Sequence, residues 1–195
     1  MPLVSANARA ASPVVRVRSY PGTEYLEPLY ELSLSLNALS TVAADENKWP
    51  SLKKRLAQFF SGGPLSEKFY YIGLSNEYVS KIEYDDISEF VQGDKASHTE
   101  CITSVTDHME ALKKELDGTV PNADTVLAEA KAASASMQAW LSLAPQADVE
   151  KAAALFLATR KADADRNGKL DTAELATLSD VDRAIWKKRV DLYGN

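Results

Sequence analysis

The stretch SHTECITSVTDHMEALKKELDG, residues 97–118, decides the fold class. Its large apolar side chains recur three and four positions apart, which is the spacing of one face of an α-helix. They are Cys101 or Ile102, followed by Val105, Met109, Leu112 and Leu116. Ser97 and Glu100 have the spacing of a capping box, and Gly118 follows the last apolar residue, as a glycine just past a helix end should. The stretch therefore predicts an amphipathic helix that begins near Ser97.

The same periodicity recurs in three earlier stretches, separated by breaks such as 61–64 and 92–94. The apolar residues are Leu29, Leu32, Leu36 and Leu39 in the first, Trp49, Leu52, Leu56 and Phe59 in the second, and Leu65, Phe69, Ile72, Val79 and Ile82 in the third. Short connections between helices favour antiparallel neighbours. The sequence therefore predicts an all-α protein with an up-down-up-down four-helix bundle at 24–118.

Residues 119–195 are predicted to form a smaller helical C-terminal region. A stripe with a heptad-like spacing opens it: Val126, Ala130, Ala133, Met137 and Trp140. A further helix starts near Asp148 and leads into a polar loop at 163–174. Ser179 then precedes a last apolar pattern and is expected to cap its helix.

Residues 1–23 are predicted to be an irregular N-terminal arm. Three prolines interrupt it, and Arg9, Arg16 and Arg18 make it basic without nearby acids. It is either a disordered leader or a segment that docks on an acidic partner. The tripeptide at 8–10 has the A-x-A form of a signal-peptidase site, so the arm can also be the remnant of a longer targeting sequence.

Composition excludes several classes of protein. Hydrophobic residues make up 45% of the 195 residues, which predicts a folded chain rather than a disordered one. The formal net charge of −6 argues against a nucleic-acid partner, because such proteins present a basic face. The single cysteine, Cys101, excludes an internal disulfide. No apolar run approaches the roughly 20 residues of a transmembrane helix, so any membrane association is expected to be peripheral.

The loop DADRNGKLDTAE, residues 163–174, matches the calcium loop of the EF-hand over all twelve positions. The expected metal ligands are Asp163, Asp165, Asn167, Lys169 through its backbone carbonyl, Asp171 and Glu174. Gly168 stands at the position where the chain must turn sharply, and Leu170 is the apolar anchor of the loop. Calcium prefers six to eight oxygen ligands, and this spacing supplies them from one short segment. A metal-free polar turn is the alternative, because EF-hands usually occur in pairs and no second loop is found.

An enzyme is not expected, because no set of nucleophile, histidine and acid is visible in the sequence. His98 and His108 lie ten positions apart, which separates them by about 80° around a helix of 3.6 residues per turn. There is also no glycine-rich phosphate loop and no zinc-binding spacing of cysteines and histidines.

Four short segments resemble the PsbQ-like extrinsic proteins of photosystem II. They are YPG at 20–22, WPSLKKRL at 49–56, FYYIGL at 69–74 and ALKKEL at 111–116. The resemblance spans about half of the chain and implies a four-helix bundle without catalytic activity in the chloroplast thylakoid lumen. It also implies that the protein caps the oxygen-evolving complex and helps it to retain calcium and chloride. The implied partners are the membrane-embedded photosystem II core and other extrinsic subunits.

The loop at 163–174 departs from the pattern of that family and supports a second hypothesis, a calcium-binding EF-hand regulator or adaptor. A calcium sensor is expected to expose a methionine-rich apolar groove when it binds the ion. The chain has three methionines, and none lies in the loop or beside it. This favours a structural calcium site within an extrinsic subunit.

Overall fold

The computed structural model describes residues 22–85, 90–165, 167 and 169–193. Within these ranges the chain forms eight α-helices and two short 3-10 helices, with no strand, which confirms the all-α prediction. None of the described helices is both long and apolar enough to cross a membrane. The predicted arm lies almost entirely outside the described residues.

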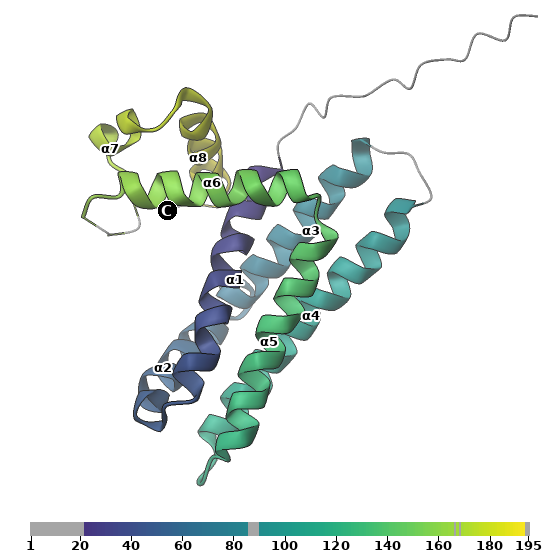
Figure 1. The fold of residues 1–195 in the computed structure, drawn as a ribbon, viewed down its shortest axis with the longest axis vertical. Helices are drawn as coiled ribbons and strands as arrows, with labels where there is room; N and C mark the ends of the chain where they lie inside the picture. The colour runs from purple at the N-terminus through teal and green to yellow at the C-terminus, as the bar shows by residue number, and fades with distance from the viewer. Residues whose placement is uncertain (1–21, 86–89, 166, 168, 194–195) are drawn as a thin grey trace, which may run out of the picture.

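The helices lie along and across one long axis (Figure 1). Their bounds are α1 (Thr23–Ala43), η1 (Glu46–Lys48), α2 (Trp49–Phe60), η2 (Gly63–Leu65), α3 (Glu67–Asp85), α4 (Phe90–Asp117), α5 (Ala123–Leu143), α6 (Gln146–Ala162), α7 (Thr172–Thr177) and α8 (Asp180–Tyr193). Helices α1, α4 and α5 run along this axis, while α6 lies across one end and leads to α7 and α8. Helix α1 packs against α3 and α5 and also against α6 and α8. It therefore connects the long helices to the C-terminal helices.

The predicted apolar faces of three helices are confirmed by burial. In α4, Val105, Met109, Leu112 and Leu116 are buried, and of the two alternatives for the first position Ile102 is buried whereas Cys101 is only partly buried. All five residues of the stripe from Val126 to Trp140 are fully buried in α5. In α1, Leu29, Leu32 and Leu36 are buried as well. These side chains form one continuous hydrophobic cluster, which is the main core of the protein.

Helix α5 belongs to this core, although the sequence analysis placed it in the C-terminal region. The chain reverses tightly between α4 and α5, where the backbone N–H of Asn122 donates to Glu115 Oε1 over 2.7 Å. Asn122 then caps α5 by accepting from the N–H of Thr125 over 3.0 Å. Ala130 and Ala133 carry small side chains that let α5 approach its neighbours closely. The predicted division after residue 118 therefore separates two helices that share one core.

The predicted start of α4 near Ser97 is wrong, because the helix already begins at Phe90. The predicted break at 92–94 and the capping box of Ser97 and Glu100 both lie inside the helix. A glycine in a helix interior costs about 1 kcal/mol, which a long packed helix can offset. The local start signal at Ser97 therefore does not set the beginning of this helix.

The predicted inner face of α3 is only partly correct. Leu65 and Phe69 are 93% and 51% exposed, whereas the inner face is made by Leu74, Tyr78 and Val79. The polar groups on this face have partners, as Ser75 Oγ accepts from the indole N–H of Trp140 over 2.8 Å. The apolar-periodicity argument identified Val79 but did not assign Leu74 and Tyr78 to this face, and the side chain of Ile82 lies outside the described residues.

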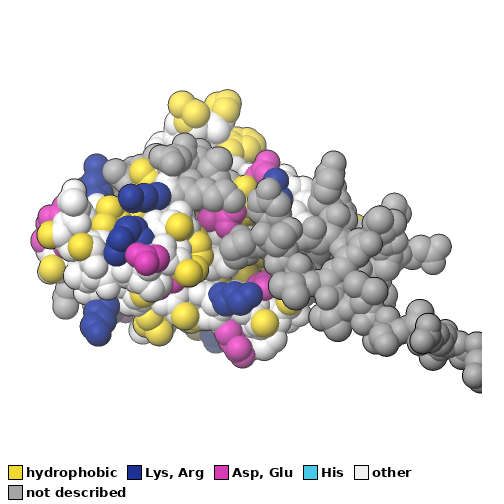
Figure 2. All heavy atoms as spheres, turned by 90° about the horizontal axis from the view of Figure 1, so that it is seen from above, with side chains coloured by type: hydrophobic (Ala, Val, Ile, Leu, Met, Phe, Trp, Pro, Cys, Tyr) yellow, Lys and Arg dark blue, Asp and Glu magenta, His cyan; other side chains and the backbone are white. Residues whose placement is uncertain are grey.

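The surface over one end of the molecule carries basic, acidic and hydrophobic side chains together. Over the coloured part of this face, lysine and arginine side chains are interspersed with acidic and hydrophobic ones (Figure 2). A nucleic-acid interface is typically a continuous basic stripe. The visible part of this face does not have that form.

Candidate metal centre

The loop between α6 and α7 brings three of the predicted metal ligands together. Asp163 follows the last residue of α6 and is buried, while Asp165 and Glu174 reach toward it from the two ends of the loop. One carboxylate oxygen from each of the three lies within 4.8 Å of the others. Two oxygens that each lie 2.3–2.6 Å from a shared calcium ion are at most about 5 Å apart. The cluster therefore has the right dimensions for a single cation.

Hydrogen bonds inside the loop hold the first half in place. The backbone N–H of Asn167 donates to Asp163 Oδ1 over 3.0 Å and to Asp165 Oδ1 over 3.1 Å. Asn167 Oδ1 in turn accepts from the N–H of Lys169 over 2.7 Å. These bonds curl the chain around the carboxylates. The sharp turn predicted at Gly168 lies outside the described residues.

Glu174 closes the loop by bonding to both of its ends. Its Oε1 accepts from the N–H of Ala164 over 2.8 Å, and its Oε2 accepts from the N–H of Asp171 over 3.0 Å. Asp171 Oδ1 accepts from the N–H of Glu174 over 2.8 Å, which completes a capping box at the start of α7. The carboxylate of Asp171 therefore caps the helix, and in EF-hand loops this position often contacts the ion through water.

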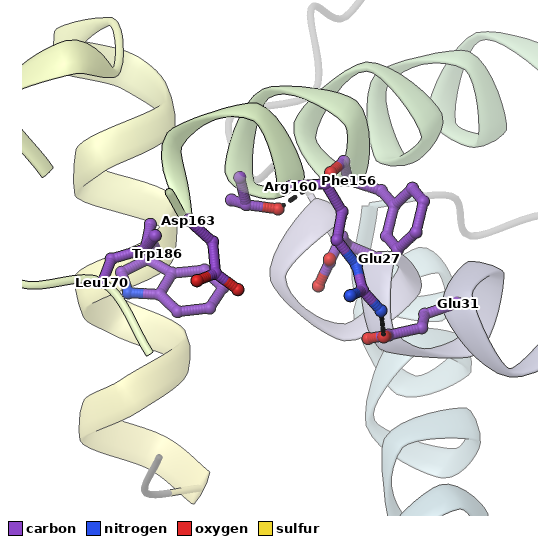
Figure 3. Close-up of a pocket in the computed structure, with 8 residues that line it drawn as sticks. Glu27, Glu31, Phe156, Arg160, Asp163, Leu170 and Trp186 are labelled. Atoms are coloured by element: carbon purple, nitrogen blue, oxygen red, sulfur yellow. Dashed lines mark hydrogen bonds and ion pairs between the residues drawn. The ribbon is translucent and has the colours of Figure 1, made fainter. Parts of the chain in front are cut away.

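The loop is anchored on the rest of the protein through an apolar contact and a small cavity. Leu170 packs against the cluster of Ala162, Leu178 and Trp186, as expected for the loop's apolar anchor. A cavity of about 80 Å³ lies between α1, α6 and α8, and Asp163, Leu170 and Trp186 form one side of it (Figure 3). The indole of Trp186 is thus close to the first predicted ligand and can report on it.

The other side of this cavity joins α6 to α1. Arg160 donates to Glu31 Oε1 over 2.7 Å, and its guanidinium lies 5.3 Å from the ring centre of Phe156. Phe156 also makes an edge contact with Tyr30, with ring centres 6.0 Å apart. The sequence analysis missed this connection, because nothing in a sequence pairs two residues 129 positions apart.

Replacing Glu31 with glutamine is expected to lower the free energy of unfolding by about 1 kcal/mol or less, because the ion pair with Arg160 is partly exposed. The difference from wild type should shrink at high salt, since salt screens exposed charges. Urea denaturation of both proteins at low and high salt measures this difference in the free energy of unfolding. Glu77→Gln is a matched control, since Glu77 is exposed and has no ion pair among the described residues. A loss for Glu31→Gln that salt leaves unchanged would contradict the electrostatic explanation.

The two histidines lie in different environments and do not form a joint site. His98 is buried, with its ring centre 4.9 Å from that of Trp140. His108 Nδ1 lies 2.7 Å from Glu129 Oε2 at the contact between α4 and α5.

The single cysteine, Cys101, lies on α4. Burial raises the pKa of the Cys101 thiol, which favours the uncharged form at neutral pH.

Comparisons of this chain with protein-family models, with curated proteins and with solved structures found no match. Its class therefore rests on its own features. Over the residues that the structure describes, it is all-helical and has one cluster of carboxylates that could hold a metal ion.

Proposed function

We propose that the loop at 163–174 binds one calcium ion. The observation that carries this proposal is the gathering of the Asp163, Asp165 and Glu174 oxygens within 4.8 Å. The Asn167 side chain, the Lys169 carbonyl and Asp171, directly or through water, complete the ligand set. Calcium fits better than magnesium, because magnesium prefers six ligands in a compact octahedron and usually keeps several waters.

The role of this ion is structural. An ion bound here joins the end of α6 to the start of α7, next to the contact of Leu170 with Trp186. Met109 and Met137 are buried in the main core, so neither is available for a sensor groove beside the loop. Calcium binding therefore stiffens the C-terminal helices against α1.

A calcium-responsive regulator or adaptor is the second candidate. The observation that favours it is an open groove between α6 and α7, lined by Ala158, Ala162, Ala173 and Leu178. An EF-hand that acts as a sensor exposes more apolar surface when calcium binds. A large calcium-dependent gain in the fluorescence of an apolar dye would favour this regulator, and an unchanged signal supports the structural role.

We further propose that the protein is a non-catalytic extrinsic subunit of photosystem II. The sequence resemblance to PsbQ-like proteins supports this proposal. Two of its segments, 49–56 and 111–116, lie in α2 and α4, and each contributes buried residues to the core. The bundle in this proposal differs from the one expected at 24–118, because α2 and α3 together form one of its four antiparallel members and α5 is another, beside α1 and α4. The subunit sits in the chloroplast thylakoid lumen and stabilises the oxygen-evolving complex and its retention of calcium and chloride.

Fractionation of thylakoid membranes tests the proposed location. The protein should sediment with the membranes at low salt, bound to the photosystem II core and its other extrinsic subunits. High salt should release it, because exposed charge contacts weaken as the Debye length falls from about 10 Å at 0.1 M to about 3 Å at 1 M. Recovery in a soluble fraction at low salt, with none on the membranes, would count against an extrinsic subunit.

A further inference from the structure

The turn between α2 and α3 holds an apolar side chain out in solvent. Leu65 is 93% exposed, and Phe69, at the first turn of α3, is 51% exposed. The turn has a defined backbone, since Gly62 and Gly63 adopt φ values of 95° and 56° that favour glycine. Its two hydrogen bonds run from the N–H of Leu65 to the Gly62 carbonyl over 3.1 Å and from the N–H of Ser66 to the Gly63 carbonyl over 3.0 Å. The exposure of Leu65 is therefore a property of an ordered turn.

Aromatic rings pack together at the end of α2 and the start of α3, on either side of the turn. The ring centres of Phe59 and Phe60 lie 5.1 Å apart, and those of Tyr70 and Tyr71 lie 5.2 Å apart. Phe59 also stacks on Tyr71, with ring centres 6.0 Å apart. These contacts join the end of α2 to the start of α3, so the apolar projection stands on a packed base.

The charges around this projection favour a negatively charged surface. Glu67, the acid nearest in sequence, is held by Arg55 through two hydrogen bonds of 2.7 Å. Glu110 pairs with Lys68 over 3.3 Å. Helix α2 has no acidic residue, and its exposed Lys54 has no ion pair among the residues that the structure describes. Among the described residues of α2 and of the first turn of α3, Glu67 is thus paired and Lys54 is left as an unpaired cation.

We propose that Leu65 and Phe69 form an apolar tip that inserts into an anionic lipid surface, with Lys54 beside the headgroups. Residues 61–66 are uncharged, and the two charged residues between Leu65 and Phe69 are each paired, Glu67 with Arg55 and Lys68 with Glu110, so a shallow insertion of the tip would bury no unpaired charge. Interfacial binding of this kind combines buried apolar area with attraction between lysine or arginine and anionic lipid. One short tip and few cations predict reversible binding.

Sedimentation with lipid vesicles tests the tip directly. The full chain should sediment with phosphatidylcholine vesicles that contain phosphatidylglycerol. The double variant Leu65→Ser with Phe69→Ser should lower the partition coefficient about tenfold or more, as expected when the burial of a leucine and half a phenylalanine is lost. Leu157→Ser is the matched control, because Leu157 is 66% exposed on α6, outside the tip, and its change should leave binding as in wild type.

A charge variant tests the electrostatic part of the same proposal. Lys54→Glu should lower partitioning onto the anionic vesicles by about fivefold or more and have little effect on pure phosphatidylcholine vesicles. All four positions are exposed, so circular dichroism should show unchanged helix content in every variant. Wild-type protein that stays in the supernatant with anionic vesicles would overturn the proposal, and so would a tip variant that binds as wild type does. Because the test uses lipid alone, its result is independent of calcium and of photosystem II.

Discussion

Replacing Trp140 with alanine is expected to lower the free energy of unfolding by about 3–5 kcal/mol. Trp140 is fully buried in α5, where its ring centre lies 5.5 Å from that of Tyr78 and 4.9 Å from that of His98. The variant would leave a large cavity and remove the hydrogen bond to Ser75. Urea denaturation followed by circular dichroism at 222 nm, the usual helix signal, measures the loss.

The control for this variant is Gln138→Ala, because Gln138 is exposed on the same helix and makes only a 3.3 Å bond to Asn37. It should change the free energy of unfolding by about 0.5 kcal/mol or less. The Trp140 variant should destabilise α1 and α4 together with α5, since all three share one core. If only the residues after 118 lost stability, the chain would instead be divided there into two folding units, as the sequence analysis predicted.

The second large expected effect is the loss of stabilisation by calcium when Glu174 is replaced with glutamine. Calcium at a hundredfold excess over its Kd should stabilise the wild-type protein by about 2.7 kcal/mol. For a chain of this length that corresponds to a rise in Tm of about 5–10 °C if the protein unfolds in one step. Glu174→Gln should abolish the rise, because it removes the negative charge and the bidentate oxygen pair that close the calcium shell.

The glutamine variant is well suited to this test, because its side-chain oxygen can still take part in the capping box of α7. Its amide nitrogen cannot accept the bond from the N–H of Ala164, but that bond is exposed, so the Tm of the calcium-free variant should fall by only a few degrees. Glu150→Gln is the matched control, since Glu150 is exposed on α6 outside the loop. A full calcium-dependent rise in Tm for Glu174→Gln would show that the ion binds elsewhere.

Much of the fold could be predicted from sequence because helical periodicity is a local property. The stripe from Val126 to Trp140 predicted the buried face of α5 residue by residue. The loop was found for the same reason, since its ligands follow one another within twelve positions. The expected cap at Ser179 is also confirmed, because its Oγ accepts from the N–H of Asp182 over 3.1 Å.

The features that sequence reasoning missed depend on contacts between distant segments. No local pattern shows that α5 packs between α1 and α4, or that α6 lies across the end of the helices. The hydrogen bond between Arg160 and Glu31 was missed for the same reason, because the two residues are far apart in the sequence. The start of α4 at Phe90 was missed because a glycine and a capping box pointed to a later start. Phe69 was assigned to the core because periodicity alone does not distinguish a buried aromatic side chain from an exposed one.

Isothermal titration calorimetry of the full chain with calcium tests the proposed metal centre most directly. The wild-type protein should bind one ion per chain, and Glu174→Gln should lose the binding heat. The fluorescence of Trp186, which lies beside Asp163 in the same cavity, should change with the same midpoint. An absence of binding heat for the wild-type protein at millimolar calcium would contradict the proposed site.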